Sequence, residues 1–186
     1  MTEQRSRPRG VLIGSKVVVF GRDDAKRVFS LGFFGKPLSV RKPKSLEEVE
    51  PPLELSLIEA TYLCEIGELE IASPEGVELD CTDLKKIASE HIREFGLIYP
   101  VYISLRRAGL VIRSALKYGA DFALYREAPG KEHAPYLLKV LESTQSVDPG
   151  DLVGWGRVAH SVRKDLIIAI SYGSRQSFIV FKWLRP

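Results

Sequence analysis

Three histidines are the side chains of this chain best suited to transfer a proton near neutral pH. His91 and His160 lie within stretches of helical spacing, which favours a packed imidazole over a catalytic one. His133 differs, because glycine and proline occur around it in the segment 130–135, which predicts a loop. Loops on a rigid scaffold carry functional residues more often than cores do. His133 is therefore the first candidate for acid or base chemistry.

The same residue types do not have the spacing of a metal site. The histidines are far apart in sequence, and the two cysteines, Cys64 and Cys81, form neither a CxxC pair nor part of a His/Cys cluster. This pattern suggests neither a zinc site nor a disulfide framework. We expect no metal and no cofactor, although ligands that are distant in sequence could still converge in the fold.

The charge is unevenly distributed along the chain. Residues 1–94 carry 14 Lys/Arg against 17 Asp/Glu, a net charge of −3, while residues 95–186 carry 13 against 7, a net charge of +6. A polyanion such as nucleic acid would prefer the second half. Unrelated domains often differ by this much, so charge alone gives only modest support for nucleic-acid binding.

The elements that must position these residues differ between the two halves. The first half predicts two strands within 11–20, a helix over 21–32, an extended loop over the proline-rich 36–52, a helix over 54–67, a strand and turn over 69–79, and helices over 82–95 and 97–109. The second half predicts strands over 110–116, 122–126, 136–142, 165–171 and 177–184, with a helix over 150–164 before the fourth strand. Tyr125 then ends a strand, and Lys164 ends a helix.

These patterns indicate an α+β protein of two small mixed α/β domains, 1–95 and 96–186, with the boundary near Phe95. No apolar run approaches the roughly 20 residues of a membrane helix. The N-terminus has no apolar stretch after its charges, unlike a secretory signal. We therefore expect a soluble protein of the cytoplasm.

The second half resembles the C-terminal catalytic domain of archaeal tRNA-splicing endonucleases and of the catalytic subunits of their eukaryotic relatives. The matching stretches are 101–125, 132–140, 157–170 and 183–186, of which RVAHSVRK (157–164) is the most specific. The resemblance implies a nuclease-like sheet flanked by helices and a catalytic triad of Tyr125, His133 and Lys164. Ala134 departs from the family, where serine is frequent, and the loop between Tyr125 and His133 is short.

The chemistry of the triad agrees with the reaction that the resemblance implies, metal-independent cleavage of RNA by its own 2′-hydroxyl. His133 would donate a proton to the leaving 5′-oxygen, and Lys164 would stabilise the charge on phosphorus. Tyr125 would be the base, although a phenol with a pKa near 10 is a poor base at neutral pH. A nearby Lys164 could lower that pKa. By pattern alone, Tyr125 is an ordinary strand aromatic and Lys164 a cation at a helix C-terminus.

Arginines and lysines supply the candidates for RNA binding. The family holds a flipped bulge base between two arginine planes, and the resemblance indicates Arg157, with Arg185 as a weaker second. A salt bridge or phosphate contact is the alternative for both. From composition, the cluster Arg41, Lys42 and Lys44 could contact phosphates, or could be a solvated loop balanced by nearby glutamates.

The resemblance further implies precursor tRNA with a bulge-helix-bulge-like site as substrate. It implies assembly as a homotetramer, or as a heterotetramer with a structural subunit. Two other functions stay open: a non-catalytic structural or RNA-binding subunit of the same assembly, and a metal-dependent nuclease. The first would typically lack part of the triad. The second would need clustered carboxylates, and the seven Asp/Glu of residues 95–186 are scattered.

Overall fold

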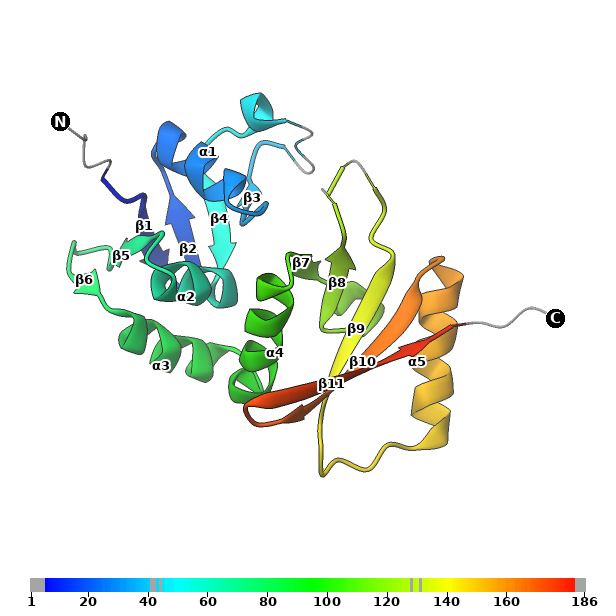
Figure 1. Cartoon of the computed structure of the whole chain (residues 1–186). Coiled ribbons are helices and arrows are strands. Elements are labelled where there is room, and N and C mark those ends of the chain that lie inside the picture. Colours follow the sequence, from blue (N-terminus) through cyan, green and yellow to red (C-terminus); the bar gives the residue numbers. More distant parts are fainter. Residues whose placement is uncertain (1–5, 41–42, 44, 128, 131, 183–186) are drawn as a thin grey trace. The chain divides into compact units, whose positions relative to one another are not determined.

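The structure is a computed structural model that describes residues 6–40, 43, 45–127, 129–130 and 132–182 (Figure 1). The chain divides into two compact units, Met1–Phe95 and Gly96–Pro186. The described residues form helices and two mixed sheets, one sheet in each unit, which confirms the α+β class. Within the described residues, no helix is long and apolar enough to cross a membrane.

The first unit is built on a sheet with strand order β3-β4-β2-β1-β5-β6. Its strands are β1 (Arg9–Ile13), β2 (Lys16–Val19), β3 (Lys36–Pro37), β4 (Leu53–Ser56), β5 (Glu70–Ala72) and β6 (Glu78–Leu79). Its helices are α1 (Arg22–Ser30), α2 (Leu57–Glu65) and α3 (Cys81–His91), with a short 3₁₀ turn at Leu46–Glu48. Only the β1–β5 pair is parallel among the described strand pairs of this sheet.

The predicted helix over 54–67 is wrong at its start, because Leu53–Ser56 forms strand β4. Leu53 and Leu55 are fully buried and alternate with half-buried Glu54 and Ser56, which is the period of a strand. The helix begins only at a capping box. The Ser56 hydroxyl accepts the Glu59 N–H, and the Glu59 carboxylate accepts the Ser56 N–H. The capping box sets the boundary that apolar spacing alone did not reveal.

Two other boundaries in this unit differ from expectation. The helix predicted over 82–95 ends at His91, because Ile92 has extended backbone angles, and Phe95 instead begins α4. The predicted loop over 36–52 contains the short strand β3 and the 3₁₀ turn, although most of its described residues are irregular. The strand and turn predicted over 69–79 form a hairpin of β5 and β6.

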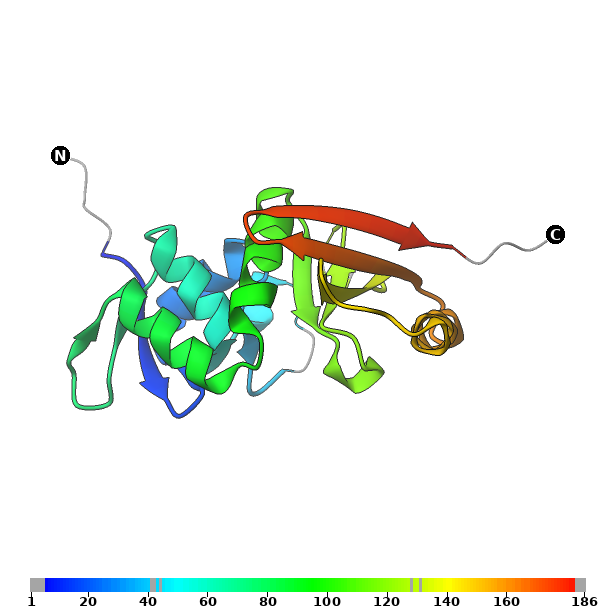
Figure 2. The same ribbon diagram turned by 90° about the horizontal axis from the view of Figure 1, so that it is seen from below.

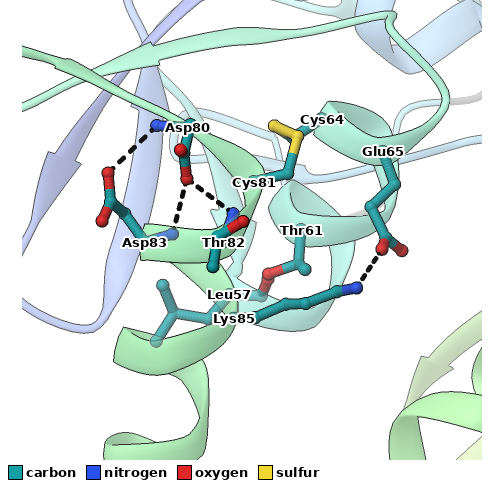
Figure 3. Close-up of a disulfide and its surroundings, with 9 residues drawn as sticks. All are labelled: Leu57, Thr61, Cys64, Glu65, Asp80, Cys81, Thr82, Asp83 and Lys85. Atoms are coloured by element: carbon teal, nitrogen blue, oxygen red, sulfur yellow. Dashed lines mark hydrogen bonds and ion pairs between the residues drawn. A yellow bond between two sulfur atoms is a disulfide. The ribbon is translucent and has the colours of Figure 1, made fainter.

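A disulfide joins Cys64 of α2 to Cys81, the first residue of α3, contrary to the expectation from spacing (Figure 3). The two Cα atoms are 5.7 Å apart. An ion pair between Lys85 and Glu65 also links these helices. The pairing depends on how α2 and α3 pack, so the spacing of 17 residues carried no signal for it. Disulfides are rare in cytosolic proteins outside hyperthermophiles, and a cytoplasmic location stays a prediction.

The second unit has a five-stranded sheet in the order β11-β10-β9-β8-β7. Its strands are β7 (Val111–Ser114), β8 (Phe122–Tyr125), β9 (Tyr136–Glu142), β10 (Asp165–Tyr172) and β11 (Arg175–Phe181). Its helices are α4 (Phe95–Arg107) and α5 (Pro149–Ser161), and a 3₁₀ turn covers Leu116–Tyr118. All five predicted strands and both helices are present, but α5 ends at Ser161, so the prediction that Lys164 ends this helix is wrong. Pro100 lies inside α4, however, and not in its first turn.

The two helices of this unit pack against opposite faces of its sheet (Figure 2). Ala159 of α5 lies in one buried cluster with Ala123 and Leu137. Phe122, the neighbour of Ala123, must point to the other face. There its ring lies 5.7 Å from the ring of Tyr102 of α4. Because α4 and α5 cover the two faces over the central strands, the functional side chains of these strands are expected at the strand ends.

Candidate active site

The topology of the second sheet brings Tyr125, His133 and Lys164 to one end of its strands β8, β9 and β10. β8 is antiparallel to β9, and β10 is parallel to β9, so the end of β8 meets the beginnings of β9 and β10. The register pairs Leu124 with Tyr136, and Tyr136 with Asp165. Tyr125 is the last residue of β8, His133 precedes β9, and Lys164 precedes β10. Tyr125 and His133, before and within the β8–β9 connection, therefore share one end of the sheet with Lys164, which is distant in sequence.

Lys164 is tied to the backbone beside His133. Its Nζ donates to the carbonyl oxygen of Ala134 at 2.6 Å. The adjacent Asp165 N–H donates to the Pro135 carbonyl at 2.9 Å. The Lys164 side chain is half-buried, so its ammonium group is held at the sheet edge. A cation is thereby fixed next to the segment that carries His133.

His133 itself is exposed, whereas Ala134 is buried in the α5-side core. The small apolar side chain of Ala134 belongs to the same buried cluster as Leu137. The segment therefore buries residue 134 and leaves the imidazole of residue 133 accessible. An exposed imidazole, on a segment whose backbone also holds a lysine ammonium group, suits proton donation to a bound polyanion.

Tyr125 is half-buried against the same core as Ala134. Burial raises the pKa of its phenol, and the positive charges of Arg113 and Lys117 only partly oppose that effect. The expectation that Lys164 lowers this pKa is wrong in direction, because the shift is upward and Lys164 is not among its causes. In the free protein Tyr125 is therefore a neutral phenol near pH 7.

Sequence reasoning missed Arg113 and Lys117 as the cations that act on Tyr125. The register pairs Val111 with Tyr125 and Arg113 with Ala123, so Arg113 and Tyr125 are diagonal neighbours on one face. Lys117 lies in the 3₁₀ turn between β7 and β8, with its Nζ 4.7 Å from the ring centre of Tyr118. The strand register, which the sequence does not give, is the signal that would have identified Arg113.

Of the predicted RNA-binding residues, only Arg157 falls within the described residues. It is exposed on α5, between half-buried Gly156 and exposed Val158. Arg41, Lys42, Lys44 and Arg185 lie outside the described residues. Among the residues that the structure describes, no group of three or more His, Cys, Asp or Glu side chains is arranged to hold a metal ion.

Comparison with known proteins gives matches in both units. Residues 95–180 match the family model of the tRNA intron endonuclease catalytic C-terminal domain, and residues 9–85 match that of the tRNA intron endonuclease N-terminal domain. A protein of Sulfolobus acidocaldarius named tRNA-splicing endonuclease is 45% identical over 95% of this chain and 98% of its own length. A protein of Hyperthermus butylicus with the same name is 42% identical over 96% of this chain and 99% of its own length.

The two family models match most of each unit, and the chain covers nearly the whole length of both relatives. The catalytic-domain match contains the sheet edge with Tyr125, His133 and Lys164. These matches leave little of the chain unassigned, and they agree with the resemblance found in the stretches 101–125 and 157–170. The chain belongs to the tRNA intron endonuclease family.

Proposed function

We propose that this chain is a catalytic subunit that removes introns from precursor tRNA. Family membership and the names of its full-length relatives support an endonuclease of tRNA splicing. The proposal adds that cleavage occurs at bulge-helix-bulge-like sites without a metal. It also adds that the products carry a 2′,3′-cyclic phosphate and a 5′-hydroxyl.

The observation that supports the mechanism is the position of Tyr125, His133 and Lys164 at one end of the second sheet, with Lys164 Nζ bound to the Ala134 carbonyl. In the proposed reaction the 2′-oxygen forms a bond to phosphorus while the bond from phosphorus to the 5′-oxygen breaks. Tyr125 takes the proton of the 2′-hydroxyl, and His133 gives a proton to the departing 5′-oxygen. Lys164 offsets the negative charge that develops on the phosphoryl oxygens.

The raised pKa of Tyr125 imposes a condition on this mechanism. The phenol must lose its own proton before it can accept one from the 2′-hydroxyl. Arg113 and Lys117 favour the phenolate, while burial opposes it. Only a small fraction of free enzyme is then in the basic form at neutral pH, so Tyr125 rather than His133 is expected to limit the rate.

The proposal assigns RNA binding to arginine planes and to phosphate contacts. Arg157 is exposed and available to stack on an unpaired base, with Arg185 as a second candidate. Arg41, Lys42 and Lys44 are proposed to contact phosphates away from the scissile bond. The active assembly is proposed to be a homotetramer, or a heterotetramer with a structural subunit.

A precursor tRNA with a single 2′-deoxy residue at the cleavage site tests the mechanism. The enzyme, purified alone and assayed with EDTA, should cut the all-ribose substrate and leave a 2′,3′-cyclic phosphate. It should not cut the deoxy substrate, because the nucleophile is missing. Loss of all activity in EDTA would indicate a metal-dependent nuclease. Absence of cleavage by the chain alone, restored by a partner subunit, would indicate a heterotetramer or a non-catalytic role, which the triad variants then separate.

A further inference from the structure

The loop between β8 and β9 is tied across its base by one carboxylate. Glu132 Oε1 accepts the backbone N–H of Arg126 at 2.6 Å and the backbone N–H of Glu127 at 2.8 Å. An isolated bridge joins Pro129 and Glu132 in the same turn, and Gly130 has a φ of 109°, which a side chain would strain. The described part of the loop is thus folded around Glu132.

The position of this carboxylate relates it to both proposed proton-transfer residues. The two N–H groups that it accepts come directly after Tyr125, the end of β8. The residue that supplies the carboxylate directly precedes His133. Glu132 therefore connects the backbone that follows Tyr125, the proposed general base, to the backbone of His133, the proposed general acid.

The far side of His133 is held by different contacts. Ala134 is buried, and its carbonyl accepts Lys164 Nζ at 2.6 Å. The guanidinium group of Arg126 hydrogen-bonds the Tyr136 hydroxyl, and its Cζ lies 5.1 Å from the centre of that ring. The imidazole of His133 is exposed, so packing does not fix it. Its location depends on the backbone, which is anchored on one side by Ala134 and on the other by Glu132.

We propose that Glu132 is a positioning residue, which sets the separation of Tyr125 and His133 by accepting the N–H groups of Arg126 and Glu127. This inference rests on the proposed function of that pair. Glu132 does not touch the reacting atoms. A shift of about 1 Å in a catalytic group can cost about 10²-fold in rate, so the loss of this tie should slow the cleavage step and leave RNA binding intact.

The charge of Glu132 and its hydrogen bonds have opposite expected effects, which makes the proposal testable. The negative charge is a minor cause that raises the pKa of Tyr125, so its removal alone should help the base. Its hydrogen bonds hold the loop, so their removal should harm the reaction. Glu132→Gln removes the charge and keeps an oxygen that accepts N–H groups, whereas Glu132→Ala removes both.

The test measures single-turnover cleavage of precursor tRNA at saturating enzyme, with RNA affinity measured separately. We expect Glu132→Ala to lose about 10- to 100-fold in rate with affinity within about twofold of wild type. Glu132→Gln should keep a rate equal to or above wild type. Glu127→Ala is the matched control, because it removes an exposed carboxylate of the same loop but leaves the Glu127 N–H in place. It should cleave at the wild-type rate.

A double-variant cycle distinguishes the positioning of His133 from a general loss of order in the β8–β9 loop. If Glu132 acts through His133, then adding Glu132→Ala to His133→Ala should slow cleavage no further. An additive loss would overturn the proposal, as would a wild-type rate in Glu132→Ala or an equal loss in Glu132→Gln. Should Glu132→Ala fail to fold by circular dichroism, Glu132→Asp, whose carboxylate is one methylene shorter, carries the same expectation. If His133→Ala itself cleaves normally, the proposed function fails rather than this inference alone.

Discussion

The two units differ in what their cross-element contacts hold together. In the first unit a disulfide and an ion pair brace α2 against α3, and Arg22 pairs with Glu50 across α1 and the following loop. These contacts are far in sequence from the proposed catalytic residues. In the second unit, contacts from Glu132 and Lys164 converge on the backbone around His133.

This difference separates stability from chemistry within one chain. The disulfide and these ion pairs of the first unit join side chains, and they stabilise the fold whatever the position of any one loop. The hydrogen bonds of Glu132 and Lys164 in the second unit run from side chains to the backbone around His133, and they fix where particular groups lie. Changes in the first unit should therefore alter unfolding more than the cleavage rate, and changes at the edge of the second should do the reverse.

The largest expected effect is that of His133→Ala, which should reduce single-turnover cleavage by about 10²–10⁴-fold. His133 is exposed, so its truncation creates no cavity, and the thermal unfolding temperature should stay near that of wild type. Cleavage assays at saturating enzyme, together with calorimetry, check both parts. A wild-type cleavage rate would remove His133 from the mechanism. A large fall in unfolding temperature would show that stability and chemistry are not separate at this edge.

The sequence predicted the second unit better than the first for a physical reason. The strands at 136–142 and 165–171 are apolar runs that are buried within a sheet covered on both faces, so their composition alone identifies them. Strand β4 is only four residues long and leads directly into α2, and apolar spacing could not separate the two. Such boundaries depend on local hydrogen bonds, here those of the Ser56–Glu59 capping box.

In the candidate site too, the sequence predicted some features and not others. His133 was identifiable as a loop histidine, and the motif indicated Tyr125 and Lys164. The direction of the Tyr125 pKa shift was not predictable, because it depends on burial and on a strand register that places Arg113 diagonally opposite. The disulfide was missed for the same reason, since the packing of α2 on α3 brings Cys64 and Cys81 together.

The second prediction concerns Tyr125 and pH. Because burial raises its pKa above the ordinary value near 10, the phenolate fraction should grow about tenfold per pH unit throughout the range from about 6 to 9. Below its pKa the group is mostly protonated, so a base at this position gains activity as pH rises. Tyr125→Phe should lower the rate by about 10²-fold.

The pH dependence is best measured in the His133→Ala background, where the imidazole at position 133 no longer titrates. The residual rate there should rise with pH, and the double variant with Tyr125→Phe gives the background hydrolysis to subtract. A subtracted rate that does not change with pH would mean that Tyr125 acts as a neutral hydrogen-bond donor. It would leave His133 as the only proton-transfer group among the three candidates.

The third prediction tests the brace in the first unit. Replacing both Cys64 and Cys81 by serine removes a cross-link between residues 17 positions apart. The chain-entropy model predicts that such a cross-link stabilises the folded state by about 3 kcal/mol. The free energy of unfolding should fall by that order, and the unfolding temperature with it. Wild-type protein with a reductant should behave like the double variant in calorimetry. The cleavage rate at 25 °C should not change, and a loss of rate in folded protein would contradict the separation of the two units.

The smallest expected effect is that of Arg157→Ala on binding of bulged RNA. The Arg157 side chain is exposed on α5, so removing it should not disturb the core formed by Ala159 and its neighbours. A base stacked on a planar side chain is worth about 1–3 kcal/mol, so the affinity for bulged RNA should fall by about 5- to 150-fold.

Arg157→Lys distinguishes stacking from charge, because lysine keeps the cation and lacks the plane. If stacking is the interaction, lysine should restore only part of the affinity for bulged RNA and nearly all of the affinity for a fully paired duplex. Lys16→Ala is the matched control, since it removes an exposed cation from β2 of the first unit. It should weaken both RNAs equally and slightly. Full restoration of affinity by lysine would mean that Arg157 only contacts a phosphate. Arg157→Ala should then reduce the log–log slope of affinity against salt concentration by about 0.7–0.9.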